Sequence, residues 1–176
     1  MGFYFRAVSI ASLFDIATRA YACAIFLAAT AVGSAPAEAG EAVSFRANYS
    51  AGTIVVKTGE RRLYYVIGDG QALRYPVGVG KAGMQWAGKA QIDGKYIKPA
   101  WASPSNITRV IPGGSPSNPM GVAALTLSGG EYAIHGTNRP DSIGGFVSSG
   151  CIRMYNQDVM DLFQRVSVGT PVVVTR

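Results

Sequence analysis

Two side chains capable of nucleophilic chemistry lie near the C-terminal end of this 176-residue chain. His135 is the only histidine in the sequence, and Cys151, one of two cysteines, follows sixteen positions later. A cysteine thiolate attacks carbonyl carbon atoms, and an imidazole can take up and return the proton that such an attack releases. The pair predicts covalent acyl transfer. The alternative interpretation is that the lone cysteine is a small buried apolar residue.

A metal site is a weaker interpretation of the same two residues. One Cys and one His fall short of the three or four ligands that zinc requires. We therefore expect no metal and no cofactor.

The segment around Cys151 predicts an amphipathic helix. Six apolar residues recur at three- and four-residue spacings within "CIRMYNQDVMDLFQRV" (151–166), namely Ile152, Tyr155, Val159, Leu162, Phe163 and Val166. Ser148, Ser149 and Gly150 precede this stripe and can supply the capping position. Cys151 is thus expected at a helix N-terminus, where the helix dipole favours the thiolate and free N–H groups at Gly150 and Cys151 can bind an oxyanion.

His135 is expected at the end of a strand. The runs 122–128 and 131–136 flank Gly129-Gly130 and read as a β-hairpin. No Asp or Glu is placed in the sequence to orient the imidazole, so we expect a backbone carbonyl, that of Gly136, to do so.

The rest of the chain from about residue 52 is typical of a β protein. Short β-branched and aromatic runs separated by turn residues occupy 53–58, 62–67, 72–79 and 170–175, and Asp93-Gly94 within 89–98 is a hairpin signal. The proline-rich segment 99–121 reads as a long loop. The expected fold is mainly β, a β-sandwich or meander of mixed sheets with one amphipathic helix following the cysteine.

The first 39 residues read as a secretory signal peptide. A basic stretch, the apolar run "YACAIFLAATAVG" (21–33) and Ala37-x-Ala39 match its three regions, with cleavage near Ala39. A retained single-pass anchor is the alternative, but the apolar run is shorter than a membrane span requires. Residues 40–51 read as a polar linker and 52–176 as the catalytic domain, exported to the periplasm or cell envelope.

The charge balance bears on the partner. Sixteen Lys and Arg against ten Asp and Glu give a net charge of +6, which suits an anionic envelope polymer. The basic residues are scattered rather than massed, so nucleic acid is not an expected partner. Trp86 and Trp101 are read either as core residues or as the lining of a peptide groove.

Several motifs together resemble a known family. "HGT", "IGG", "SSGCIRM", "NQDVMDLF" and "VGTPVVV" are similar to the L,D-transpeptidase catalytic domain, the YkuD-like family of cell-wall enzymes, over about residues 50–176. The resemblance implies that Cys151 is the nucleophile, His135 the base, and Gly136 the residue whose carbonyl orients that base. Arg153 occupies a position that is polar in the family, whereas Ser149 stands where the family commonly has histidine.

The resemblance also implies a reaction and its partners. Cys151 would attack a peptidoglycan stem peptide between its third residue and D-alanine, and the resulting thioester would pass to an amine. That amine belongs to another stem, giving a 3→3 cross-link, or to a protein such as an outer-membrane protein. Carbapenems are the expected inhibitors. The alternatives are an L,D-carboxypeptidase or endopeptidase using the same acyl-enzyme, and a non-catalytic peptidoglycan-binding homologue.

Overall fold

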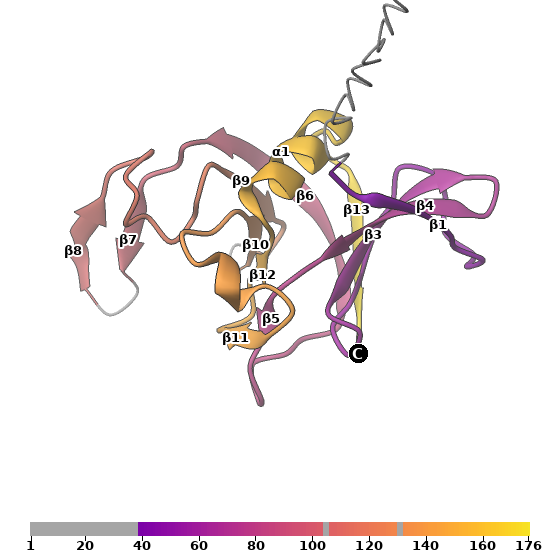
Figure 1. Cartoon of the computed structure of the whole chain (residues 1–176), viewed down its shortest axis with the longest axis horizontal. Coiled ribbons are helices and arrows are strands. Elements are labelled where there is room, and N and C mark those ends of the chain that lie inside the picture. Colours follow the sequence, from indigo (N-terminus) through magenta and orange to yellow (C-terminus); the bar gives the residue numbers. More distant parts are fainter. Residues whose placement is uncertain (1–38, 104–105, 130–131) are drawn as a thin grey trace, which may run out of the picture. The chain divides into compact units, whose positions relative to one another are not determined.

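A computed structural model describes residues 39–103, 106–129 and 132–176 (Figure 1). The predicted signal peptide falls on residues 1–38, outside the described residues, except for Ala39 at its end. Within the described ranges, no helix combines the length and the apolar character that a membrane crossing needs.

The predicted fold class is confirmed: in the described residues, mixed β-sheets are accompanied by one α-helix. Nine strands form one sheet in the order β1-β4-β3-β2-β13-β6-β9-β10-β12. Their bounds are Glu41–Ser44 (β1), Ile54–Lys57 (β2), Arg62–Gly68 (β3), Gln71–Pro76 (β4), Gly88–Ile97 (β6), Ala123–Leu127 (β9), Ala133–His135 (β10), Ile152–Arg153 (β12) and Pro171–Thr175 (β13). Neighbours pair antiparallel except β2 with β13 and β10 with β12, which pair parallel.

Two small sheets complete the architecture. β5 (Val79–Gly80) pairs parallel with β11 (Phe146–Ser148), and β7 (Trp101–Ser103) pairs antiparallel with β8 (Asn106–Ile111). The predicted 99–121 loop is therefore wrong in part, because this segment contains the β7–β8 pair. A short 3₁₀ helix covers Pro140–Ser142.

Strand β6 links the two halves of the large sheet. Its first residues pair with β13 and its last residues pair with β9, and the register shifts between Ile92 and Gly94. Asp93 lies at this bulge and accepts a hydrogen bond from the Thr126 hydroxyl. The predicted hairpin turn at Asp93-Gly94 is wrong: the two residues form a bulge, which bends a continuous strand and lets it serve two neighbours.

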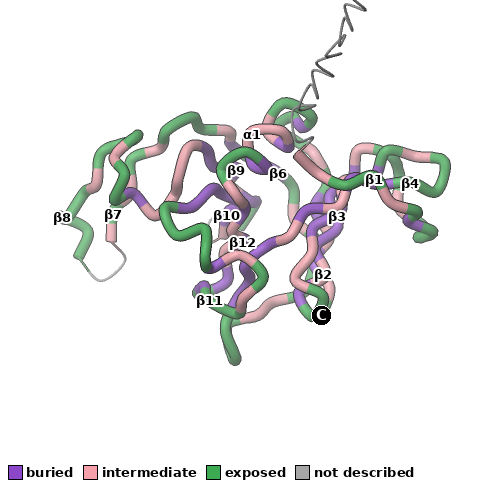
Figure 2. The backbone as a smooth tube through the Cα atoms, in the orientation of Figure 1, coloured by how far each residue is buried: buried purple, intermediate pink, exposed green. Residues whose placement is uncertain are grey.

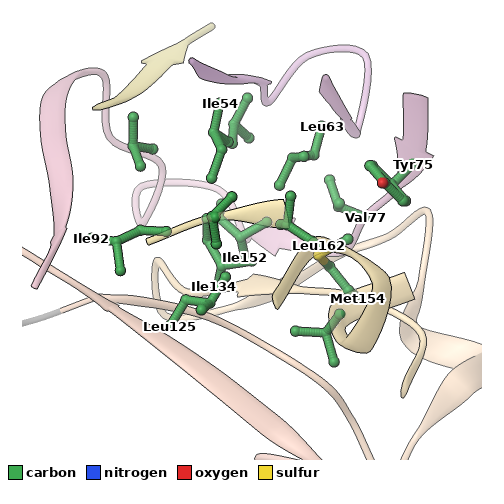
Figure 3. Close-up of a cluster of buried hydrophobic side chains, with 14 of the residues drawn as sticks. Ile54, Leu63, Tyr75, Val77, Ile92, Leu125, Ile134, Ile152, Met154 and Leu162 are labelled. Atoms are coloured by element: carbon green, nitrogen blue, oxygen red, sulfur yellow. The ribbon is translucent and has the colours of Figure 1, made fainter. Parts of the chain in front are cut away.

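A single helix, α1 (Asn156–Arg165), covers part of the hydrophobic core. Its buried Val159 and Leu162 join a cluster of buried side chains. Figure 3 shows Leu162 in this cluster with Ile54, Leu63, Tyr75, Ile134 and Ile152, and Figure 2 colours the backbone by burial. The Tyr75 hydroxyl donates to Asp161 at 2.5 Å, which ties the helix to β4. Lys95 donates to the carbonyls of Phe163 and Val166, so this lysine caps the helix C-terminus rather than facing solvent.

The segment 40–51 is not wholly an unstructured linker. Residues Glu41–Ser44 form β1, which pairs with β4 from Glu41 opposite Arg74 to Ser44 opposite Gln71. Phe45 is buried and stacks on Tyr64, with ring centroids 4.6 Å apart. The large sheet thus includes residues about ten positions before the predicted start of the catalytic domain.

Candidate active site

His135 and Arg153 lie opposite each other on two adjacent parallel strands. In the β10–β12 pair, Ile134 is the partner of Ile152 and His135 is the partner of Arg153. Ile134 and Ile152 point into the core (Figure 3). Because side chains alternate along a strand, His135 and Arg153 project from the other face. Cys151 immediately precedes β12, and its thiol contacts the backbone of Ala133, just before Ile134 on β10.

The imidazole of His135 is held by one backbone contact. The ring is 4% exposed, and its Nδ1 lies 2.6 Å from the Gly136 carbonyl oxygen. A carbonyl can only accept, so Nδ1 carries the proton and Nε2 is left with its lone pair. Burial lowers the pKa of His135 to about 4, opposed by the Gly136 bond and assisted by the charge of Arg153. The ring is therefore a neutral base at neutral pH.

The turn that follows His135 is fixed by Asn156, the first residue of α1. Its Oδ1 accepts hydrogen bonds from the backbone N–H of Thr137 at 2.9 Å and of Val122 at 3.4 Å. A Cβ atom at Gly136 would lie 2.3 Å from that same oxygen. Glycine at 136 thus allows the amide to approach closely, and this contact holds the carbonyl that orients the imidazole.

Cys151 is not at a helix N-terminus, which corrects the sequence prediction. It precedes β12, and the helix begins five residues later at Asn156. No helix dipole acts directly on the thiol. Burial raises the pKa of Cys151, while the Ala133 backbone and the charge of Arg153 act in the opposite direction. The surroundings of Cys151 thus favour the thiol over the thiolate.

The loop that carries Cys151 is shaped by the side chain of Ser148. The buried hydroxyl donates to the Cys151 carbonyl at 2.6 Å and accepts from the Gly150 N–H at 3.1 Å. The Gly150 N–H, one of the two predicted oxyanion donors, is therefore engaged by Ser148. For the other, the Cys151 N–H, the described residues show no backbone acceptor.

An aromatic wall flanks the same loop. Trp86 donates from Nε1 to the Gly150 carbonyl at 3.0 Å and stacks on Tyr132 with ring centroids 5.0 Å apart. Gly150 has a φ of +126°, and a Cβ there would lie 2.2 Å from the Tyr132 ring. This position therefore accepts only glycine. Trp86 also packs against the main hydrophobic core, so it is a partly buried core residue whose indole N–H reaches the loop of Cys151.

The two remaining predicted site residues differ in their surroundings. Ser149 is exposed, and none of the described residues accepts or donates a hydrogen bond to its side chain. The Arg153 backbone pairs with Gly78, and its Nε is buried without a partner among the described residues. Burial and the charge of Arg139 lower the pKa of Arg153. Within the same ranges, no cluster of three or more His, Cys, Asp or Glu residues is suited to a metal ion.

Three residues that shape the site were not singled out for it by sequence reasoning. The pattern around Ser148 predicts a helix cap, Trp86 has two interpretations, and no role follows from the sequence for Asn156. Asn156 is the first residue of α1, after the N-cap residue Tyr155, so the capping preference does not single it out. The contacts of Trp86 join positions 64 residues apart, and nothing in local spacing indicates them.

Comparison with known proteins adds to this geometry. A family model described as the L,D-transpeptidase catalytic domain, YkuD, matches residues 51–174. The probable L,D-transpeptidase ErfK/SrfK of Escherichia coli (strain K12) is 39% identical over 135 residues, covering 68% of this chain and 42% of that protein. The probable L,D-transpeptidase YbiS of the same strain is 38% identical, covering 68% and 43%. The chain thus spans less than half the length of these relatives.

Solved structures share the fold. L,D-transpeptidase 3 from Mycobacterium tuberculosis matches with a TM-score of 0.59 and 16% identity, over 70% of this chain and 60% of that one. The catalytic domain from the E. faecium L,D-transpeptidase, described as acylated by ertapenem, matches with a TM-score of 0.55 and 21% identity, over 70% and 95%. With the family model matched along nearly all of the described domain, this chain belongs to the L,D-transpeptidase catalytic domain family.

Proposed function

We propose that the protein is an exported L,D-transpeptidase that forms a thioester between Cys151 and a peptidoglycan stem peptide and transfers the acyl group to an amine. The observation that carries the proposal is the state of His135. Its Nδ1 proton is committed to the Gly136 carbonyl, its ring is neutral, and its strand lies beside the segment that begins at Cys151. These features support His135 as the base for the Cys151 thiol, with the Gly136 carbonyl in the place of an acidic third residue.

The first half-reaction cleaves the donor peptide. Nε2 of His135 takes the thiol proton while the sulfur attacks the carbonyl carbon of the third, diamino-acid residue. The Cys151 N–H donates to the oxyanion that forms. The bond to the fourth residue then breaks, and His135 gives its proton to the amine of the departing D-alanine. A thioester and free D-alanine are the products.

The second half-reaction resolves the thioester. An amine attacks the thioester carbonyl, His135 takes the proton of the attacking nitrogen, and the sulfur leaves and is reprotonated as the thiol. An amine on another stem peptide gives a 3→3 cross-link, and an amine on a protein, such as an outer-membrane protein, attaches that protein to the wall. Water in the same place would give hydrolysis.

The proposed location and inhibitors follow from separate observations. Residues 1–39 have the pattern of a signal peptide, which would bring the domain to the periplasm beside its polymer substrate. Carbapenems are proposed as inhibitors because their strained carbonyl would meet the same thiol. The E. faecium domain acylated by ertapenem and LdtMt1 in complex with imipenem support this part of the proposal.

The test is product analysis with a defined donor. The purified protein is incubated with disaccharide-tetrapeptide, and the products are identified by mass. We expect release of D-alanine together with a cross-linked dimer, and neither product with Cys151→Ala. Tripeptide without dimer would replace the proposal with a carboxypeptidase, and the absence of both products would leave a non-catalytic wall-binding domain.

A further inference from the structure

A basic recess lies next to the candidate active site. It has a volume of about 370 Å³ and is lined by Trp101, Asn138 and three arginines, among other residues. The arginines come from separate parts of the chain: Arg109 from β8, Arg139 from the loop before the 3₁₀ helix, and Arg153 from β12. No acidic residue lines the recess.

The charges in the recess are poorly compensated within the described residues. Arg139 lies 3.5 Å from Asp141, but both side chains are about 70% exposed, so this ion pair contributes little. The Nε of Arg153 is buried without a hydrogen-bond partner. Leaving such a donor unpaired costs free energy, and so does gathering like charges. An anion in the recess would relieve both costs.

The flat fork of a guanidinium suits a carboxylate, which can accept two parallel hydrogen bonds. The recess also lies close to the thiol, because its lining residue Arg153 is two positions after Cys151 in the chain. Residues two apart on a strand are separated by roughly 6.6 Å, so the Arg153 side chain starts about that far from Cys151. In a peptide donor, the carboxylate of the residue after the scissile bond is one residue from the attacked carbonyl, roughly 3.6 Å away.

We propose that Arg109, Arg139 and Arg153 bind the free C-terminal carboxylate of the donor peptide, the carboxylate of the residue that leaves. This inference rests on the proposed function, because it assigns one end of the donor in that reaction. Its consequence is specificity for the length of the donor. A peptide extended or amidated at its fourth residue lacks the carboxylate and leaves the three guanidinium groups unpaired.

Binding to a protein that cannot be acylated tests the assignment directly. In a Cys151→Ala background, affinity is measured by calorimetry for the tetrapeptide acid and for the same peptide with a C-terminal amide. We expect the acid to bind at least about tenfold more tightly, as charge-assisted hydrogen bonds are the stronger class. In Arg109→Gln/Arg139→Gln, the preference should fall to about twofold or less. Arg46→Gln, an exposed arginine outside the recess, is the matched control and should keep it.

Two further donors separate this carboxylate from others on the stem. One is amidated at the glutamyl carboxyl and the other at the diamino-acid carboxyl. The Arg109→Gln/Arg139→Gln double variant should weaken binding of both donors as much as it weakens binding of the tetrapeptide acid. An acid preference that survives in the double variant would overturn the proposal. The proposal would also be overturned if the double variant no longer weakened binding once one of these two internal carboxyls was amidated. Because binding is read without acylation, a failure of the proposed reaction would show separately, as the absence of a thioester on the unmodified protein.

Discussion

Nδ1 of His135 lies 2.6 Å from the carbonyl oxygen of the next residue, Gly136. A carbonyl in this place fixes the tautomer of the ring as a carboxylate would, but it brings no charge that would stabilise an imidazolium. Burial lowers the pKa of His135, and burial raises the pKa of Cys151. We infer that the resting site is a neutral thiol and a neutral imidazole, and that the thiol loses its proton as it attacks.

The ionisation of Cys151 gives the first prediction. The rate of iodoacetamide modification should rise with pH around an inflection above about 8.5, the ordinary value for cysteine, because burial disfavours the thiolate. Arg153→Gln should move the inflection higher, since the charge of Arg153 lowers the pKa of this thiol. An inflection below about 7 would show a preformed thiolate and contradict this account.

Two adjacent serines give a matched pair of substitutions. Ser148→Ala removes a buried hydroxyl that bonds both Cys151 and Gly150, and it should lower the free energy of unfolding by about 1–3 kcal/mol and the acylation rate by tenfold or more. Ser149→Ala alters an exposed side chain and should change stability by no more than about 0.5 kcal/mol. Chemical denaturation and stopped-flow acylation by a carbapenem measure both effects. Equal effects at the two positions would argue against Ser148 as the residue that shapes the loop.

Trp86 is expected to position the loop through its hydrogen bond. Trp86→Phe keeps a ring beside Tyr132 but removes the donor to the Gly150 carbonyl, and it should lower kcat for transpeptidation about tenfold with little change in KM. Tyr132→Phe keeps the stacked ring and is the control, expected to stay within about twofold of the parent. A fall in kcat of the same size in both variants would point to the stacking rather than the hydrogen bond.

Asp158 gives a pH-dependent prediction for stability. Its side chain is 4% exposed, and burial, then the charge of Asp161, raises its pKa to about 6. Because the folded-state pKa lies above the unfolded one, stability falls as the pH rises from about 4 to about 6 and is then constant. Asp158→Asn should therefore raise the free energy of unfolding by up to about 3 kcal/mol at pH 7, and the gain should vanish below about pH 4.

Urea unfolding from pH 4 to pH 8 measures this dependence, with the exposed Asp141→Asn as a control that should follow the parent curve. A pH-independent difference between Asp158→Asn and the parent would show that Asp158 does not titrate near 6 in the folded protein.

The strands that could be predicted are those whose local pattern and tertiary pairing agree. The run 170–175 became β13, between β2 and β6, and the alternation on either side of Gly129 indicated the β9–β10 pair. Asp93-Gly94 carries a turn signal as strong as any in the chain, yet β13 and β9 hold both sides of that point in one strand. Local turn preference was overridden by pairing partners remote in sequence.

The helix start was misplaced because two periodicities overlap. Ile152 and Tyr155 fit the apolar stripe of the helix, but Ile152 and Met154 are both buried while Arg153 between them is half-buried. That alternation of period two belongs to β12 and was the signal for a strand. His135 and Cys151 could be found from residue type alone. The arginine recess could not, because it joins β8, a loop and β12 across the fold.

In the proposed reaction, Cys151 carries the acyl group and His135 drives its transfer. Intact-mass measurement of the protein after brief mixing with a tetrapeptide donor tests both roles. We expect an adduct equal in mass to the donor less D-alanine, mapped to Cys151 by digestion, absent in Cys151→Ala and formed at least about a hundredfold more slowly in His135→Asn. An unmodified Cys151 with a competent donor, or an adduct that persists in Cys151→Ala, would contradict it.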